Sequence, residues 1–450
     1  MNDCSVNLTD MKISFYTPAL LIAFVSISMG ETVKDREGAV RKDKETMQGD
    51  ALWLYNDYEK GFAEARRVGK PLLVVLRCVP CLSCMGLDAG VLSSAELKPL
   101  LEKFVCVRLI NANAIDLAKF QFDYDLSLSA LIFNPDGTIY GRYGSWTHQK
   151  DPAEKTTAGF KLALESALKV HAGYPQNRAG LVGKQGGPTP FKTPIEIPSL
   201  AGRYKRDLDW DGKVVASCVH CHQIGDAYRN FYRSQSKPIP SEFIYPMPMP
   251  ETVGLTLAPD QKARVQSVVA GSIADKSGVR TGDEFIALNG QLLFSIADFA
   301  WALHRAPESG TIPAKILRGK VEQQINLTLP VSWREKTDIS KRVGTWGMRG
   351  MATGGLVLGD IADEDRAKRG LANDSLALLV KFVGQYNQHA AAKNAGFQKD
   401  DVILEIDGRS ARLTEGQFIG QLLQTTKPGQ KLTAIVLRGE KRLTLSLPMQ

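Results

Sequence analysis

Three cysteines at intervals of three residues, Cys78, Cys81 and Cys84, directly follow an apolar run, and this feature constrains the fold more than any other. The run from Pro71 to Leu76 has the length and the apolar composition of a buried strand. If the chain turns helical from Cys81 onward, the free N–H groups and the dipole of the first turn favour a thiolate there. The pattern therefore predicts a reactive cysteine at the end of a strand.

The same segment resembles the thioredoxin-like fold. Gly69 to Val75 is similar to the strand that enters the redox motif in that family. Val91 to Leu97 is similar to the start of the helix that follows the motif. The resemblance covers residues 50–173 and implies an α/β domain with thiol redox activity.

The resemblance also assigns roles to the cysteines. It aligns Cys84 with the second cysteine of the family and Cys81 with its nucleophile, so that Cys78 is an addition. The sequence departs from the family at Leu128, which stands where the family carries a cis-proline facing the redox pair. A cis bond before a residue other than proline costs about 3 kcal/mol, so we expect a trans bond and an altered substrate-docking edge.

Two other interpretations of these cysteines stay open. The closely spaced thiols can form a structural disulfide, or they can bind a metal together with Cys106 on the following strand. Cys106 itself is expected to fill the core as a small apolar residue. The strand before the motif and the helix after it favour thiol redox chemistry.

Helices and strands are expected to alternate through this region, as a thioredoxin-like fold requires. Apolar residues at helical spacing predict the helices, and an Asp-Gly pair predicts a hairpin. The expected elements are a helix at 56–68, a helix near 95–103, a strand near 104–110, a hairpin across Asp136 and Gly137, and a closing helix at 160–171.

The N-terminal region carries the features of an export signal. An apolar stretch from Ile13 to Met29 follows Lys12 and ends in small residues. It predicts a signal peptide at residues 1–30, because a membrane-spanning helix requires about 20 apolar residues. The protein is therefore expected in the periplasm, or anchored at the inner membrane if the segment is uncleaved. Residues 31–49 are charged, lack apolar periodicity and are expected to be a flexible lead-in.

A second cysteine motif follows a predicted linker. Residues 174–203 are rich in Gly and Pro, which is typical of a linker. In the next segment, 204–250, the residues Cys218, Cys221 and His222 have the Cys-x-x-Cys-His spacing of a c-type haem attachment site. Two thioethers and an iron-binding imidazole from the same turn make haem c a candidate cofactor.

The segment leaves alternatives open. Met247 or Met249 is the candidate sixth ligand of a haem iron. Without haem, Cys218 and Cys221 form a dithiol or disulfide that the first domain reduces, or a zinc site with the histidine that ends the motif. His220, between the two cysteines, is expected to be a solvated side chain.

The last two hundred residues contain an internal repeat with an offset of about 120 residues. Gly278 to Asp283 recurs as Gly396 to Asp401. Each copy continues with an Asn-Gly or Asp-Gly hairpin signal and then a helix, expected at 297–306 and 415–425. The repeat predicts two related, mainly β domains.

The two copies resemble PDZ domains of the type attached to bacterial periplasmic proteases, over residues 251–332 and 344–450. The resemblance implies a loop whose N–H groups hold the C-terminal carboxylate of a peptide, while the peptide adds a strand beside the helix. The second copy departs from the pattern at Asp400, in place of a glycine, and in a charged insert at 360–372. A copy that packs and binds nothing is the alternative. The implied peptide-binding residues are Gly254, Leu255, Thr256 and Leu257 in the first copy and Gly355, Leu356, Val357 and Leu358 in the second.

The order of these segments resembles a planctomycete-type family of exported thioredoxin-like/PDZ proteins, some of which carry selenocysteine. The implied fold class is multidomain, with an α/β thioredoxin-like domain, a short Cys-x-x-Cys-His segment and two mainly β PDZ-like domains. The net charge of +8 is spread without a long run of one sign, which does not indicate nucleic-acid binding. No Gly-x-Ser-x-Gly or Gly-Asp-Ser-Gly precedes the repeats, so a protease is not expected.

Three functions follow as hypotheses. The first is an exported thiol–disulfide oxidoreductase in which Cys81 attacks, Cys84 resolves the mixed disulfide and the PDZ domains recruit protein or peptide C-termini. The second is electron transfer by haem c, with the dithiol or another protein as the redox partner. The third is a PDZ scaffold whose cysteines are structural.

Overall fold

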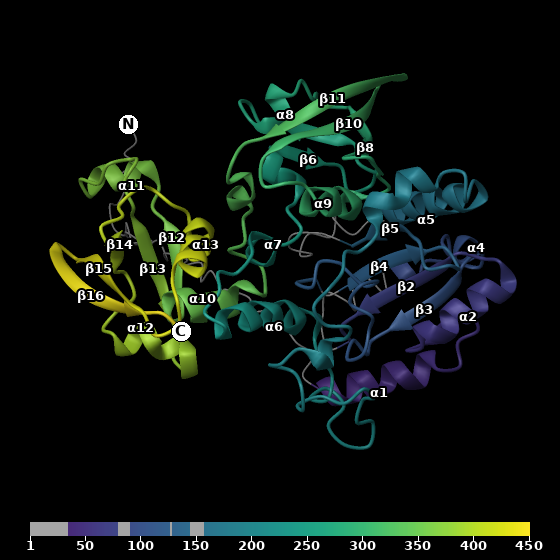
Figure 1. Ribbon diagram of the computed structural model, residues 1–450, viewed down its shortest axis with the longest axis horizontal. Coiled ribbons are helices and arrows are strands. Elements are labelled where there is room, and N and C mark those ends of the chain that lie inside the picture. The colour runs from purple at the N-terminus through teal and green to yellow at the C-terminus, as the bar shows by residue number, and fades with distance from the viewer. Residues whose placement is uncertain (1–34, 80–90, 127, 145–156) are drawn as a thin grey trace, which may run out of the picture.

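The structure is a computed structural model that describes residues 35–79, 91–126, 128–144 and 157–450. In Figure 1 an α/β sheet lies at the right, the first copy of the repeat (residues 251–332, repeat 1) at the top and the second copy (residues 344–450, repeat 2) at the left. Cys81, Cys84 and the predicted signal peptide lie outside the described residues. Within those residues, no helix is long and apolar enough to cross a membrane.

The first sheet has five strands in the order β1-β3-β2-β4-β5. Strands β1, β3 and β2 run parallel, whereas β4 and β5 are antiparallel to their neighbours. The helix expected near 95–103 is only one turn long, while the other expected elements are present. They are β1 (Trp53–Tyr55), α2 (Tyr58–Val68), β2 (Leu72–Arg77), α4 (Lys98–Leu101), β3 (Val105–Leu109), β4 (Leu128–Phe133), β5 (Ile139–Tyr143) and α5 (Thr157–Ala172).

Strand β2 is the centre of this sheet, and all six of its residues are buried. Its continuous apolar sequence fits a strand covered on both faces. Leu73 packs in a core cluster with residues of α5, whereas Leu72 and Val74 pack in a second cluster with residues of α2. Because β2 ends at Arg77, Cys78 lies at the carboxyl end of the central strand.

The charged segment 31–49, expected to be flexible, instead contains helix α1 (Arg36–Met47). Asp35 caps the helix by accepting a hydrogen bond from the Gly38 N–H. Asp43 forms a buried ion pair with Arg108 of β3, which fixes the helix on the sheet. The prediction of a flexible lead-in was wrong. The charged residues of the segment pair with residues far away in the sequence, such as Arg108, and the local sequence does not reveal such partners.

Residues 174–203 were predicted to be a linker, but they pack against the first domain, and residues 178–184 lie between its sheet and repeat 1. The segment contains two short 3₁₀ helices, η3 (Arg178–Lys184) and η4 (Pro194–Glu196). Lys184 is fully buried, and its Nζ lies 2.7 Å from Asp298 Oδ2 in repeat 1. Gly and Pro indicated an irregular backbone correctly, but composition does not tell whether such a backbone is packed.

The first part of the segment 204–250 lies against the first sheet, whereas its last residues pack against the two repeats. It contains α6 (Cys221–Ser234) and α7 (Ser241–Ile244). Ile224, Ala227 and Tyr228 of α6 are buried in the cluster that also holds Leu72 and Val74 of β2. The Cys-x-x-Cys-His motif is therefore part of the core built on the thioredoxin-like sheet.

Repeat 1 contains a four-stranded sheet in the order β11-β10-β8-β9 and a separate β6-β7 pair. Its helix α9 contacts the first domain, where the Asp298 carboxylate accepts hydrogen bonds from the Arg142 N–H and from Lys184. The elements are η5 (Pro250–Val253), β6 (Leu255–Leu257), β7 (Val265–Val268), α8 (Ile273–Lys276), β8 (Glu284–Leu288), β9 (Gln291–Leu292), α9 (Ile296–His304), β10 (Gly310–Arg318) and β11 (Val321–Leu329), and the 3₁₀ helix η6 (Trp333–Lys336) follows the repeat.

Repeat 2 contains a five-stranded antiparallel sheet in the order β12-β13-β14-β15-β16. The charged insert at 360–372 forms a short helix, α11. The elements are α10 (Thr345–Thr353), β12 (Leu356–Asp360), α11 (Asp363–Lys368), β13 (Leu378–Val383), η7 (Asn387–Ala390), α12 (Ala391–Asn394), β14 (Val402–Ile406), α13 (Glu415–Thr425), β15 (Lys431–Arg438) and β16 (Lys441–Pro448).

The two repeats share one ion pair at the same place in each fold. Arg318 binds Asp283 at 2.8 Å in repeat 1, and Arg438 binds Asp401 at 2.7 Å in repeat 2. The turn before each aspartate has a positive φ, which is +89° at Gly282 and +69° at the preceding residue of repeat 2, Asp400. Asp400 therefore keeps the turn although the glycine is replaced, since Asp tolerates the left-handed region.

Candidate functional site

The candidate site lies where the carboxyl end of β2 meets the second cysteine motif. The Cys78 Sγ lies 3.5 Å from the His220 Nδ1. Burial, and then His222 and Arg36, lower the pKa of His220 to about 4, so its imidazole is neutral at pH 7. A neutral imidazole has one nitrogen that accepts a proton, and which nitrogen this is depends on the tautomer. The expectation of a solvated His220 was wrong, because the segment folds onto the sheet.

The two other thiols of the motif lie at the same junction. The Cys218 Sγ donates to the Ile110 carbonyl at 3.5 Å, and Cys221 is the first residue of α6. Burial, and then the neighbouring Cys78, raise the pKa of Cys218 to about 12. Burial and the same thiol also raise the pKa of Cys221. Both thiols are therefore protonated and weakly nucleophilic in this conformation.

At Cys221, burial affects the pKa of the thiol more strongly than the helix N-terminus does. A thiol at the start of a helix is normally more acidic, because the free N–H groups favour the thiolate. Here the sulfur lies in an apolar environment beside two other thiols, and the pKa of Cys221 is raised. Cys106 behaves as expected for a core residue, with 1% of its surface exposed. The described residues contain no cluster of three or more His, Cys, Asp or Glu side chains that could hold a metal.

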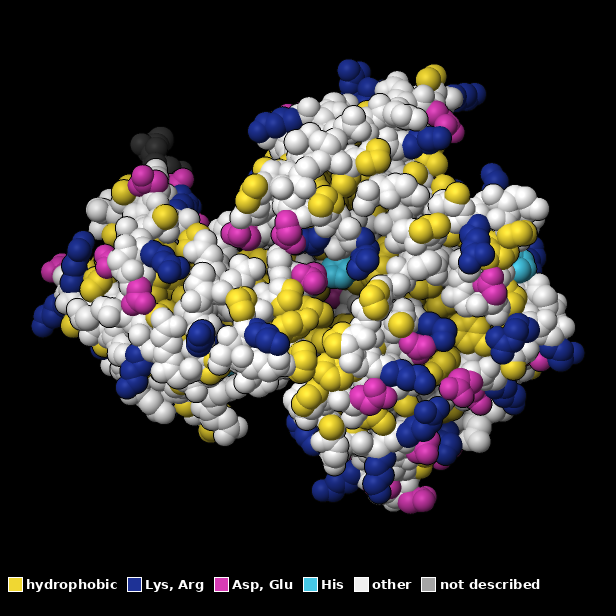
Figure 2. All heavy atoms as spheres, viewed as in Figure 1, with side chains coloured by type: hydrophobic (Ala, Val, Ile, Leu, Met, Phe, Trp, Pro, Cys, Tyr) yellow, Lys and Arg dark blue, Asp and Glu magenta, His cyan; other side chains and the backbone are white. Residues whose placement is uncertain are grey.

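A surface pocket of about 480 Å³ gives access to this junction. Cys218 and His220 line it together with Arg36, Glu37 and Gln223, among others. The Gln223 side chain accepts a hydrogen bond from the His220 N–H at 2.8 Å, which holds the start of α6. Elsewhere, basic and acidic side chains are interspersed over the face shown in Figure 2.

The residues as placed do not fit a covalent haem. The two cysteines of the motif pack in apolar clusters with the first domain, and His222 pairs with Asp226 at 3.7 Å. The predicted sixth ligands, Met247 and Met249, pack in a different cluster with Trp301 of α9. The structure therefore does not bring the methionines together with the Cys-x-x-Cys-His motif.

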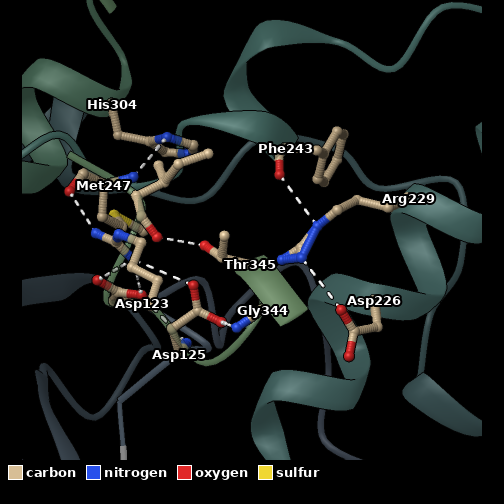
Figure 3. Close-up of polar contacts among 11 residues, drawn as sticks. Asp123, Asp125, Asp226, Arg229, Phe243, Met247, His304, Gly344 and Thr345 are labelled. Carbon is tan, nitrogen blue, oxygen red and sulfur yellow. Dashed lines mark hydrogen bonds and ion pairs between the residues drawn. The ribbon is translucent and has the colours of Figure 1, made fainter. Parts of the chain in front are cut away.

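Met247 belongs to a polar junction between the domains, shown in Figure 3. Its N–H donates to the His304 Nδ1 at 3.4 Å, and its carbonyl accepts a hydrogen bond from Arg342 at 3.1 Å. Arg342 also binds Asp123 and Asp125 of the first domain. The segment around Met247 thus connects repeat 1, the chain between the repeats and the sheet.

The predicted peptide-binding residues of repeat 1 lie at the start of β6. Gly254 has a φ of +87°, and a Cβ there would lie 2.1 Å from the Ser272 Cβ. Leu255 and Leu257 are buried in a cluster that also contains Trp333. Thr256 is partly exposed. Trp333 follows the repeat in sequence. A residue from outside the repeat therefore shares the core cluster of the predicted peptide loop.

The corresponding residues of repeat 2 lie at the start of β12. Gly355 has a φ of +92°, as a tight loop before an edge strand requires. Leu356 and Leu358 are buried, whereas Val357 is partly exposed. Two N–H groups in this stretch already have partners, because Gly355 donates to a backbone carbonyl and Leu358 to a carboxylate.

Comparison with known families identifies two domains in the chain. A thioredoxin-like family model matches residues 53–135. A PDZ domain model matches residues 378–449, within repeat 2. The chain therefore contains a thioredoxin-like domain, whose central strand leads to Cys78, and a PDZ domain in the sheet-rich C-terminal region.

Curated relatives match parts of the chain. A probable periplasmic serine endoprotease DegP-like from Chlamydia trachomatis serovar D is 26% identical over 216 residues, which is 48% of this chain and 39% of the relative. A protein of the same description from Marinomonas sp. is 24% identical over 176 residues, which is 39% of this chain and 34% of the relative. The chain thus spans little more than a third of the length of these relatives.

Solved structures also show limited similarity. The HtrA-type protease AlgW with a decapeptide is 20% identical and covers 31% of this chain and 48% of its own, with a TM-score of 0.20. A variant of that protease with the same peptide is 19% identical and covers 42% of this chain and 54% of its own, with a TM-score of 0.21.

Proposed function

We propose that the protein is an exported thiol–disulfide exchange protein whose two PDZ-like repeats bind client chains. The observation that carries this proposal is the 3.5 Å contact between Cys78 and His220, which joins the two cysteine motifs of the chain in one site. A thioredoxin-like domain and a PDZ domain in the same chain are compatible with a redox protein that binds proteins.

The proposed reaction uses the cysteine pair implied by the family resemblance. The Cys81 thiolate attacks one sulfur of a client disulfide, and the second client sulfur leaves as a thiolate and takes up a proton. Cys84 then attacks the mixed disulfide, which releases the client as a dithiol and leaves a Cys81–Cys84 disulfide. A dithiol reductant returns this disulfide to two thiols. Both cysteines lie outside the described residues, so their roles rest on the resemblance.

The proposed role of His220 is to accept the proton of Cys78. The thiolate is the nucleophilic form of cysteine, and an adjacent neutral imidazole can generate it during the attack. Cys218 and Cys221 have raised pKa values, and within the described part of the chain neither thiol has such a contact with an imidazole. We therefore assign Cys78, rather than Cys218 or Cys221, to the exchange site.

The reduction of insulin by dithiothreitol tests the proposed activity. We expect the wild-type protein to accelerate the reaction and Cys81→Ser to abolish the acceleration. Cys84→Ser is expected to accumulate mixed disulfides with client proteins, whereas Cys81→Ser accumulates few. Absence of acceleration by the wild-type protein, or full activity of Cys81→Ser, would contradict the proposal.

A pair of matched variants tests the role of His220. We expect His220→Gln to slow the alkylation of Cys78 by iodoacetamide about tenfold at pH 7, because the proton acceptor is lost. His389→Gln is the control, since His389 lies in repeat 2, outside this junction. The rate is measured by mass spectrometry in a Cys81→Ser, Cys84→Ser background. Equal slowing in both variants would remove His220 from the site.

Export is the last part of the proposal. It is supported by the apolar stretch from Ile13 to Met29 and by the periplasmic description of both curated relatives. The expected result is a mature protein that begins near residue 31 after expression in a Gram-negative host. N-terminal sequencing of the periplasmic fraction measures it, and retention of the whole segment in the membrane fraction would indicate an anchor instead.

A further inference from the structure

Strand β12 of repeat 2 has one side without a neighbouring strand. It is the end strand in the described sheet order and pairs only with β13 there. A peptide that binds a PDZ domain adds its strand at such an edge, beside the helix. The pairing of β12 with β13 shifts in register between Val357 and Leu358. This irregularity changes the direction in which the following N–H groups of β12 point. The Leu358 N–H points to helix α13, so this side of β12 is the peptide edge.

A carboxylate of the chain itself already occupies the peptide edge. The Leu358 N–H donates to the Glu415 Oε1 at 2.7 Å. Glu415 is the first residue of α13, after the N-cap Thr414. A short hydrogen bond to a charged acceptor is about twice as strong as one between neutral groups. A peptide carbonyl can reach this N–H only after Glu415 has moved away.

Arg349 of α10 holds the carboxylate of Glu415 in this position. Its Nε lies 2.9 Å from the Glu415 Oε1, and its Nη2 lies 2.6 Å from Oε2. Arg349 is 8% exposed and Glu415 is 5% exposed, so the pair is buried. Movement of Glu415 alone would leave the guanidinium buried without its partner, which is costly.

The same helix also engages the loop before β12. The carbonyl of Arg349 accepts a hydrogen bond from the Gly355 N–H at 3.0 Å. Met348, Met351 and Ala352 of α10 lie in the same core cluster as Leu356 and Leu358. Figure 1 shows α10 beside α13 and the base of β12. We call two contacts the latch: that of the Glu415 carboxylate with the Leu358 N–H, and that of the Arg349 carbonyl with the Gly355 N–H.

Repeat 1 provides an internal comparison. Its helix α9 begins after the N-cap Ser295 with Ile296, where α13 begins after Thr414 with Glu415. An isoleucine side chain has no acceptor for a strand N–H. The latch residues therefore belong to repeat 2 and not to the repeated fold.

We propose that the latch gates the PDZ domain of repeat 2, so that a peptide with a free C-terminal carboxylate binds β12 only after Glu415 releases the Leu358 N–H. The inference rests on the peptide-binding part of the proposed function and is independent of its thiol chemistry. The fraction of molecules with a free edge sets the apparent affinity, because the intrinsic dissociation constant is divided by that fraction. Removal of the latch should therefore strengthen binding.

The test compares variants of the full chain. Glu415→Ala removes the acceptor, and Arg349→Met combined with Glu415→Ala also removes the buried charge that the single change leaves. Glu440→Ala is the control, since Glu440 is an exposed acidic residue in the same domain. One measurement is hydrogen–deuterium exchange of residues 354–360, and the other is binding to an array of random decapeptides with free C-termini. An amidated array reports binding that does not involve the carboxylate.

We expect faster exchange at 354–360 and at least tenfold more binding to the free-carboxylate array for both latch variants, with Glu440→Ala unchanged. Unchanged exchange in the double variant would overturn the latch as a barrier. Faster exchange without a gain in carboxylate-dependent binding would overturn it as a gate for peptides. The thiol chemistry is decided separately, by the loss of insulin reduction in Cys81→Ser, which does not depend on the latch.

Discussion

Replacing Arg342 by methionine is expected to open the junction between the first domain and the chain that connects the two repeats. Arg342 Nη1 lies 2.8 and 2.9 Å from the two oxygens of Asp123 and 3.3 Å from Asp125 Oδ2. The exposed fractions of these side chains are 10% for the arginine and 2% and 5% for the aspartates. Both carboxylates therefore contact the same guanidinium, and Figure 3 shows Asp123 and Asp125 close to Met247 and Gly344.

The cost of this change follows from the burial of the group. Removing one partner of a buried ion pair costs about 3–5 kcal/mol, because a charge remains without compensation. The Gly344 N–H still donates to the Asp125 Oδ1 at 3.0 Å after the change, so the lower value applies. A loss of about 3 kcal/mol corresponds to an increase of about 100-fold in the open fraction of the junction.

Hydrogen–deuterium exchange measures this opening in the intact protein. We expect residues 340–346 and 123–126 to exchange about 100-fold faster in Arg342→Met than in the wild type. Arg206→Met is the control, because its ion pair with Glu59 is exposed by more than 60% on both sides and is worth about 0–1 kcal/mol. An acceleration of less than tenfold in Arg342→Met would refute the reasoning.

Three further predictions concern the thiols, a buried lysine and the haem interpretation. In the folded protein, Cys218 and Cys221 should react with iodoacetamide at least 100-fold more slowly than in the protein unfolded in urea, because burial raises their pKa values. Mass spectrometry gives the rates, and equal rates would contradict this placement of the two thiols. Burial lowers the pKa of Lys184 to about 8 in the folded protein. Between pH 8 and about 10.4 the unfolded chain therefore binds more protons at this lysine than the folded chain does, so its contribution to stability rises with pH. The unfolding free energy of the wild type minus that of Lys184→Met should increase from pH 8 to pH 10, and a decrease would refute this. Protein from a host that matures cytochromes c should give no pyridine haemochrome band after acid acetone, and a covalent band would restore the haem interpretation.

The first domain could be predicted from sequence because its signals are local. The apolar run before Cys78 forms β2, and the helical spacing of apolar residues at 160–171 corresponds to α5. The repeat was predictable for the same reason, since each copy carries its own turn and hairpin signals. Helix α13 spans Glu415–Thr425, as the periodicity indicated.

The contacts between these units could not be predicted in the same way. Asp43 and Arg108 are 65 positions apart, and Lys184 and Asp298 are 114 positions apart. Each of these four residues is an ordinary charged residue when only its sequence neighbours are considered. Burial of such a charge depends on a partner that another part of the chain supplies. Composition therefore predicted a flexible lead-in and a linker where the structure has packed segments.

The candidate site shows the same limit at the level of one motif. The backbone of His220 is extended, with φ −71° and ψ 140°, and the helix begins at the next residue. The imidazoles of His220 and His222 therefore meet different partners, although only one residue separates them. One contacts Cys78, which lies 142 positions earlier, and the other pairs with Asp226 within the helix. The Cys-x-x-Cys-His spacing is the same for a haem site and for this helix start. The chemistry of the motif is therefore decided by the surface against which it packs. Here that surface carries the thiol of Cys78.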